Sequence, residues 1–164
     1  MPKVNESDLD WDALERGEAK FRRKRLADAA GGDDLGCSLY ELPPGKKSWP
    51  YHYHTANEEA IYVLEGEGQL RRADDATSLE PGDYVALPTG EDGAHRIIND
   101  SDATLRYLAV STMETPEVLV YPDSGKVGVM DGAPPGGTGE RTLEGYFRED
   151  DAVDYWDGER GDAE

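Results

Sequence analysis

Three histidines and one glutamate are the residues of this sequence whose types and spacing could bind a metal ion. His52 and His54 are separated by one residue, and His95 is the only other histidine of the chain. Along a β-strand, residues i and i+2 project from one face with Cα atoms about 6.6 Å apart, so a single cation could lie between both imidazoles. Glu59 has the opposite parity to His54, but a turn across residues 55–57 would return its carboxylate to the same cavity.

Three neutral imidazoles and one carboxylate suit a divalent transition metal such as Zn, Fe, Mn, Ni, Co or Cu, and ligand type alone does not choose among these. We therefore predict one divalent transition metal ion bound by His52, His54, Glu59 and His95. A metal that takes more than four ligands would keep positions for water, substrate or dioxygen. Glu58 competes with Glu59 for the carboxylate role. A single histidine more commonly has a structural role than a metal-binding one. The spacing of all four residues together, however, argues for metal binding.

The spacing of these residues among glycines resembles the two sequence motifs of the cupin superfamily. The first motif is occupied by Gly45, His52, His54, Glu59 and Gly66. The second motif is occupied by Gly82, Pro88, Gly90, His95 and Asn99. The resemblance supports Glu59 over Glu58, because only Glu59 leaves six residues before Gly66. It implies an all-β, jelly-roll-like barrel, a double-stranded β-helix, with the metal inside. The four glycines are expected in turns with positive φ, and Asn99 in a side-chain turn.

The pattern along the chain divides it into three regions. Residues 1–34 form an N-terminal arm, residues 35–120 show period-two alternation with frequent turn signals, and residues 121–164 are rich in Gly, Pro and acid. Short strands joined by tight turns predict an antiparallel sandwich or barrel for the middle region. The last region retains several aromatic residues, so we expect parts of it to pack on the barrel or on a second subunit and its acidic end to be mobile.

The N-terminal arm carries two local signals. Trp11, Leu14 and Phe21 recur at near-helical spacing, which predicts a short helix. Residues 21–25, FRRKR, form the one basic cluster of the chain. An anion-binding patch is one interpretation of this cluster. We favour a solvated segment that pairs with the protein's own carboxylates.

Composition excludes several classes of partner. Acidic residues outnumber basic ones by 36 to 17, which gives a formal charge of −19 and repels nucleic acid. The excess of acid with scarce Lys is typical of a salt-adapted, halophilic protein. No segment approaches a membrane span or a secretion signal, so we expect a cytoplasmic protein without membrane partners. Cys37 is the only cysteine, and we interpret it as a buried strand residue.

The metal constellation allows two classes of function. One is a metal-dependent enzyme of the oxygenase or isomerase type that acts on a small organic substrate. The other is a non-catalytic cupin that binds or senses a small molecule. Few acids, bases or cations are expected to face the cavity, and no catalytic residue is assigned. The family resemblance also implies a homodimer. The arginines considered for an anionic ligand, each favoured as a surface ion-pair residue, are Arg71, Arg72, Arg96 and Arg106.

Overall fold

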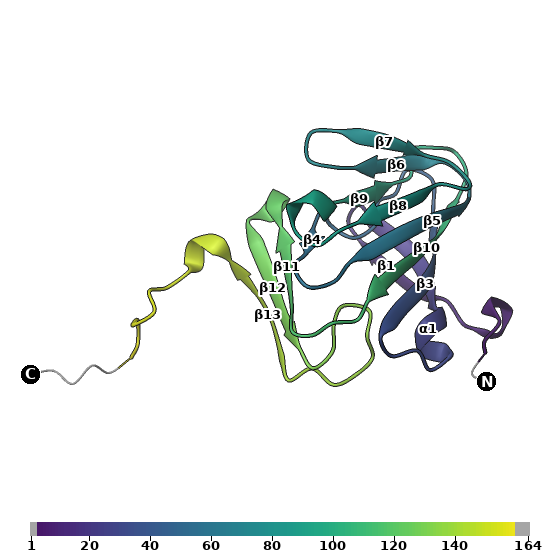
Figure 1. The fold of residues 1–164 in the computed structure, drawn as a ribbon. Coiled ribbons are helices and arrows are strands. Elements are labelled where there is room, and N and C mark those ends of the chain that lie inside the picture. Colours follow the sequence, from purple (N-terminus) through teal and green to yellow (C-terminus); the bar gives the residue numbers. More distant parts are fainter. Residues whose placement is uncertain (1–2, 160–164) are drawn as a thin grey trace, which may run out of the picture.

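The computed structural model describes residues 3–159 and consists mainly of antiparallel strands, in agreement with the period-two pattern (Figure 1). The first sheet has the order β1-β2-β3-β10-β5-β8, the second β13-β12-β11-β4 and the third β7-β6-β9. The strands of the first sheet are β1 (Asp12–Arg16), β2 (Ala19–Arg25), β3 (Leu35–Leu42), β5 (Glu59–Glu65), β8 (Tyr84–Leu87) and β10 (Leu105–Thr112). Those of the other two sheets are β4 (Tyr53–His54), β6 (Gly68–Arg71), β7 (Ala76–Leu79), β9 (Arg96–Ile98), β11 (Glu117–Tyr121), β12 (Lys126–Asp131) and β13 (Leu143–Arg148).

Helices are short and lie between the strands. The one α-helix among the described residues is α1 (Leu26–Ala29), between β2 and β3. The 3-10 turns of the same part of the chain are Glu6–Asp8, Glu91–Gly93, Pro122–Ser124 and Glu149–Asp151. Over residues 3–159, no helix is long and apolar enough to cross a membrane.

The helix predicted in the N-terminal arm is wrong. Leu14 lies in β1 and Phe21 in β2, and the two residues face each other in an antiparallel hairpin. Over residues 19–22 of β2, buried and more exposed residues alternate, and Phe21 is one of the buried residues of the core. This part of the chain therefore has the period of two that is typical of a strand. The expected pairing of the basic cluster with carboxylates is confirmed for its three arginines. Arg22 Nε donates to Glu41 at 2.7 Å, and Arg23 Nε and Arg25 Nη2 donate to Asp12 at 3.2 and 3.0 Å.

The hydrophobic core lies on the inner face of the first sheet. Leu42 and Leu105 face each other across β3 and β10 and are fully buried. The next pair on this face, Tyr40 and Tyr107, stacks with ring centroids 5.2 Å apart. Asn99 closes the end of this core by donating to the Leu42 carbonyl at 2.7 Å, and its own carbonyl accepts from the backbone of a following turn. The core therefore fixes the positions of β3, β10 and β5, and β5 begins at Glu59.

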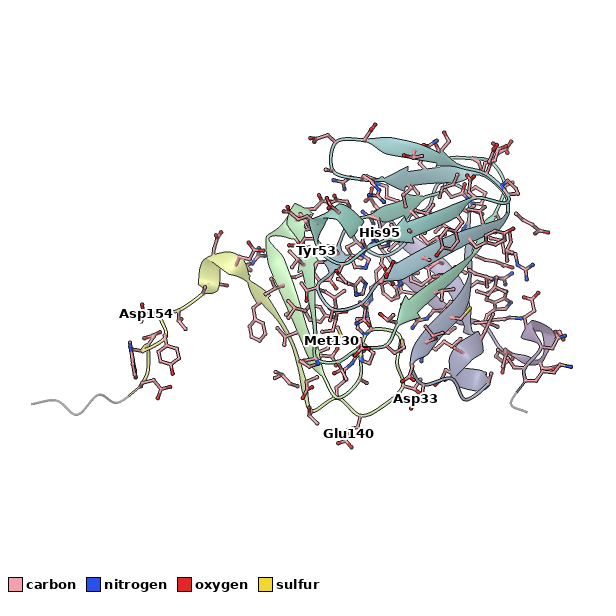
Figure 2. The ribbon with its side chains drawn as sticks, in the orientation of Figure 1. Asp33, Tyr53, His95, Met130, Glu140 and Asp154 are labelled. Carbon is pink, nitrogen blue, oxygen red and sulfur yellow. The ribbon has the colours of Figure 1, made fainter. Side chains whose placement is uncertain are left out.

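The second sheet stands across from the first (Figure 1). It carries His54 on β4, and β12 and β13 extend it as far as Arg148. The loop after β12 returns toward the first sheet, where the Thr138 hydroxyl donates to Asp28 at 2.7 Å. Beyond Arg148 the chain runs away from the body, and Figure 2 places Asp154 far from both sheets.

The turn glycines Gly45, Gly66, Gly82 and Gly90 all have positive φ, as expected. Of these, Gly66 also lies against another strand, because a Cβ there would overlap the Thr104 carbonyl oxygen. A Cβ on Gly45 would meet nothing within 4 Å. Both positions avoid the cost of about 1–2 kcal/mol that a left-handed conformation imposes on other residues.

We expect Gly66→Ala to destabilise the fold clearly more than Gly45→Ala. Both variants incur the backbone cost of positive φ, whereas only Gly66→Ala adds a steric overlap worth about 1–3 kcal/mol. Denaturant unfolding of the two variants beside the parent protein measures the difference. Equal losses of unfolding free energy would show that the close approach at Thr104 relaxes without cost.

Candidate metal centre

Backbone pairing brings the three histidines together at one end of the barrel. His52 and His95 form a bridge in which each amide donates to the other's carbonyl, at 3.2 and 2.9 Å. His54 lies two residues after His52 in β4, paired with Leu119 of β11. The His52 ring centroid is 5.1 Å from that of His54 and 5.0 Å from that of His95. All three histidines are buried, at 8%, 6% and 7% exposure for His52, His54 and His95.

Hydrogen bonds orient the three imidazoles in the same way. The Nδ1 atom of His52 lies 2.7 Å from the Pro50 carbonyl oxygen, and that of His95 lies 2.9 Å from the Gly93 carbonyl oxygen. Since a carbonyl can only accept, these contacts place the proton on Nδ1 and leave Nε2 with a free lone pair. His54 follows the pattern, with Nδ1 3.0 Å from a Glu117 carboxylate oxygen. An outward Nδ1–H and an inward Nε2 are typical of metal-binding histidines.

Glu59 brings a carboxylate oxygen to the inward nitrogens. Its Oε2 lies 3.3 Å from His54 Nε2 and 3.5 Å from His95 Nε2. Each of His52, His54 and Glu59 offers a ligand atom, and these atoms lie within 4.8 Å of one another. Two ligands each about 2.1 Å from one ion at a tetrahedral angle are about 3.4 Å apart, which the two Glu59 contacts match. His95 contacts Glu59 but is not part of the mutually close group of His52, His54 and Glu59. The turn at residues 55–57 resets the strand parity as expected, and the competing Glu58 is exposed.

Burial and mutual contacts set the protonation of the cluster. Burial lowers the pKa of His52 to about 3, with a smaller contribution from His95, and burial also lowers the pKa of His95. Burial opposes the charge on His54 too, but its contacts with Glu117 and Glu59 raise its pKa to about 9. Burial of Glu59 disfavours its anion, yet contact with His54 and the other imidazoles holds its pKa below the usual range. At neutral pH His52 and His95 are therefore neutral, each with its Nδ1 proton, and His54 carries one additional proton and a positive charge.

Glu117 is a buried residue beside the cluster that the sequence patterns did not indicate. Its side chain is fully buried and accepts hydrogen bonds from the backbone amides of Thr55 and Ala56 at 3.1 and 3.0 Å. Its other oxygen accepts from the Asn57 amide and from His54 Nδ1. One carboxylate thus fixes the imidazole of His54 and the turn that delivers Glu59. A lone acid at the start of an apolar strand was the only available signal.

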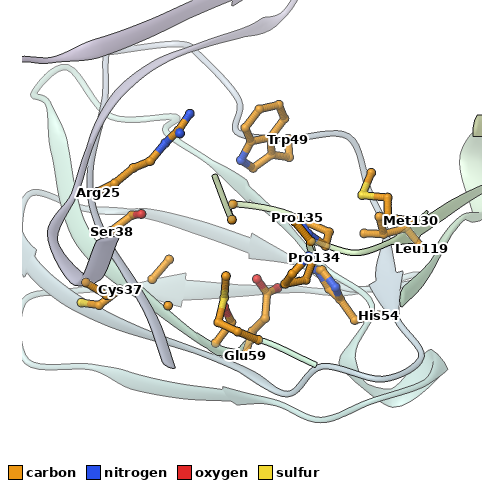
Figure 3. Close-up of a pocket in the computed structure, with 18 of the residues that line it drawn as sticks. Arg25, Cys37, Ser38, Trp49, His54, Glu59, Leu119, Met130, Pro134 and Pro135 are labelled. Atoms are coloured by element: carbon orange, nitrogen blue, oxygen red, sulfur yellow. The ribbon is translucent and has the colours of Figure 1, made fainter. Parts of the chain in front are cut away.

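The cluster opens into a cavity of about 860 Å³ between the first and second sheets (Figure 3). Ile61 and Ala109 supply apolar surface from the first sheet, whereas Val63 lies in the core. Tyr121 of β11 stacks on His52 with ring centroids 5.8 Å apart. Half-buried Cys37 also lines the cavity. The charged residues that line it are Arg23, Arg25, Asp28, Asp33, Glu59, Arg141 and Glu144.

The four arginines considered from the sequence do not line this cavity. Arg71 pairs with Asp123 at 2.6 Å and Arg96 lies 3.6 Å from Glu18, as expected for surface ion pairs. Arg106 contacts Glu6, whereas Arg72 donates to the Asp92 carbonyl at 2.6 Å rather than to a carboxylate. The arginines that do reach the cavity come instead from β2 and from the segment before β13.

Comparison with known proteins agrees with this fold. Residues 38–111 match the family described as Cupin domain. A candidate sugar phosphate isomerase from Acidithiobacillus ferrooxidans is similar in structure, with 30% identity, 90% of each chain covered and a TM-score of 0.77. A sugar phosphate isomerase of the cupin superfamily from Silicibacter pomeroyi superposes with a TM-score of 0.76 at 28% identity, covering 95% of this chain and 98% of the other. The chain belongs to the cupin superfamily.

A curated relative is the dimethylsulfoniopropionate lyase DddQ of Ruegeria pomeroyi. It is 34% identical over 92 residues, which are 56% of this chain and 44% of the lyase. The chain therefore spans less than half the length of that relative. This partial similarity leaves the reaction to be argued from the site.

Proposed function

We propose that His52, His54, Glu59 and His95 hold one divalent transition metal ion, and that the centre catalyses an isomerase- or lyase-type reaction on a small organic molecule. The observation that carries this proposal is the common orientation of the imidazoles. Each has its Nδ1 against a carbonyl or carboxylate acceptor, and Nε2 of two of them lies within 3.5 Å of one Glu59 oxygen. In the metal-free protein the proton of His54 pairs with Glu59, and a divalent cation would take the place of that proton between the inward-facing atoms.

The bound metal would act as a Lewis acid on a substrate carbonyl or carboxylate. The chain's own residues have separate roles around it. The imidazoles and Glu59 hold the ion, and Glu117 fixes the orientation of His54. Ile61 and Ala109 form an apolar wall that excludes water from one side of the substrate, and the cavity volume suits a molecule of small to moderate size.

The relatives favour reactions without net oxidation. Two of the similar structures carry isomerase names and the curated relative is a lyase. Both reaction types gain from a metal that stabilises negative charge next to a carbonyl or carboxylate. The oxygenase alternative uses the same ligand set but requires dioxygen consumption.

The decisive test is turnover by the metal-loaded protein. We expect conversion of dimethylsulfoniopropionate or of a sugar phosphate, followed by NMR of the substrate, and no conversion by His52→Ala. Oxygen-electrode measurements on the same samples separate the oxygenase alternative. Tight binding of these compounds without any conversion would instead favour a non-catalytic module.

Metal uptake should be strongly pH-dependent. Because the contacts of His54 raise its pKa to about 9, a metal must displace a proton from this ring at neutral pH. Affinity should therefore fall about tenfold per pH unit as the pH decreases below 9, with about one proton released per metal at pH 7. Calorimetry in buffers of different ionisation enthalpy measures the released proton. Uptake that does not change between pH 6 and pH 9 would contradict the assignment of His54.

We also propose that the chain pairs as a homodimer. β13 is the edge strand of the second sheet, and Tyr146 and Phe147 on it are 52% and 54% exposed. Edge strands with exposed aromatics are suited to association with a second copy. Light scattering should give twice the monomer mass, and a monomeric mass at both low and high salt would contradict the pairing.

A further inference from the structure

We propose that Arg25 and Arg23 form an anion-binding subsite in the cavity of the metal centre, which makes the substrate a small organic molecule with a carboxylate or phosphate group. One end of the substrate would bind the arginines and the other end would bind the metal. The second part of this inference rests on the proposed function. Both arginines are on β2, in the basic cluster of the N-terminal arm, and both line the cavity (Figure 3 labels Arg25).

Strand register places these arginines and the ligand-bearing strand on one face of the first sheet. Arg25 pairs with Ser38 of β3, Ser38 with Ala109 of β10, and Ala109 with Ile61 of β5. Directly paired residues share a face of a sheet, and Glu59 lies two residues before Ile61 on that same face. Arg23 heads the next row in the same way, opposite Tyr40. The side chains of β2 and of Glu59 therefore meet over one surface.

The guanidinium groups keep unused donors. Arg25 Nη2 donates to Asp12 Oδ2 at 3.0 Å, but its Nε is buried and has no hydrogen-bond partner among the described residues. Arg23 Nε donates to the same Asp12 oxygen at 3.2 Å. Two positive charges thus share one carboxylate, which leaves one charge in excess. The Nη1 group of Arg25 makes no hydrogen bond among the described residues and is not among the buried atoms, so it is the donor that an oxyanion in the cavity can reach.

Neighbouring hydroxyl groups add directed donors. The Tyr40 hydroxyl lies 3.2 Å from Trp49 Nε1 and 3.4 Å from Arg23 Nη1, and both nitrogens can only donate. The proton of this hydroxyl is therefore available to a ligand. Ser38, which pairs with Arg25, also lines the cavity and offers a hydroxyl group there. These groups favour an acceptor-rich ligand such as a carboxylate or phosphate.

The acids that face the cavity are largely engaged elsewhere. Asp28 accepts from the Thr138 hydroxyl, and Glu144 pairs with Arg141 at 2.6 Å. Asp33 is exposed, and Glu59 belongs to the metal cluster. The formal charge of −19 repels anions from the protein as a whole, so an anion can bind only where cations are concentrated locally.

The separation of the two ends fits a small bifunctional molecule. Arg25 and Ile61 are three strand positions apart, which corresponds to about 14 Å between their Cα atoms. The long arginine side chain and the metal ligands shorten this span from both sides. A compound with an anionic group at one end and a metal-binding oxygen at the other can therefore reach both.

Calorimetric titration of acetate and of inorganic phosphate into chelator-treated protein tests the subsite without any metal. We expect binding to be weakened at least about tenfold in Arg25→Met and retained in part in Arg25→Lys, because a charge-assisted hydrogen bond is lost in the first and only altered in the second. The matched control is Arg22→Met on the same strand, since Arg22 points to the opposite face and pairs with Glu41. It should bind both anions as the parent does. Preference for acetate or phosphate identifies the group.

Succinate titrated into the metal-reloaded protein then tests the two-ended arrangement. Succinate should bind more tightly than acetate, and this advantage should disappear in Arg25→Met and in His52→Ala. Anion binding that is equal in the parent and Arg25→Met, with both folded by circular dichroism, would overturn the subsite. Anion binding that depends on Arg25 in a protein that takes up no metal would support the subsite and reject the metal proposal instead.

Discussion

Protein purified without chelator should carry about one equivalent of a divalent transition metal, and the His52→Ala, His95→Ala double variant should carry almost none. The two rings supply two of the four proposed ligands and meet through a backbone bridge between distant segments. The remaining His54 and Glu59 cannot complete a tetrahedral site. Elemental analysis of both proteins, after the same purification, measures the loss. Equal metal content in the two would contradict the assignment of the ligands.

Adjacent glutamates provide the matched control for this experiment. Glu59→Gln replaces the carboxylate that lies 3.3 Å from His54 Nε2, and its metal content should fall with that of the double variant. Glu58→Gln makes the same chemical change one residue earlier, at an exposed side chain, and should keep the metal. Loss of metal from both variants alike would indicate a general effect of charge rather than coordination.

Local geometry explains why sequence spacing alone could relate three of the four proposed ligands, His52, His54 and Glu59. His52 and His54 project from one strand face, and a turn of a few residues delivers Glu59, so spacing alone relates these three residues. The position of His95 depends on a long-range bridge, and only the family resemblance placed it beside the others. The resemblance also predicted the barrel.

The residues around the cluster were less predictable because their partners are distant in sequence. Glu117 contacts a histidine 63 positions away, and no local pattern marks such a pairing. The N-terminal arm was assigned a helix because three aromatic and apolar residues matched a period of 3.6, whereas packing of β2 against β3 selects strands. Arg25 was grouped with a solvated basic cluster. Only the register of β2 shows that alternate residues of that cluster face the cavity and the solvent.

Replacement of Glu117 by Gln should weaken metal binding about 10- to 100-fold although Glu117 is not a proposed ligand. The carboxylate accepts five hydrogen bonds, one of them from His54 Nδ1 at 3.0 Å. An amide has one accepting oxygen, so the variant must leave at least one of the donors around it unsatisfied in a buried site. His54 would then rotate or change tautomer and lose the inward direction of its Nε2. Metal affinity measured by competition with a chelator tests this result.

The fold should also suffer, because Glu117 joins the turn at residues 55–57 to β11. We expect a loss of about 3–5 kcal/mol in unfolding free energy for Glu117→Ala, the usual cost of removing one partner from a buried charged pair. Glu114→Gln is the matched control, since Glu114 is exposed and contacts Asn57 only through its backbone. It should leave stability and metal affinity unchanged. If Glu117→Gln bound metal as tightly as this control, the orientation of His54 would not depend on Glu117, and the direction of the imidazoles would have to come from β4 alone.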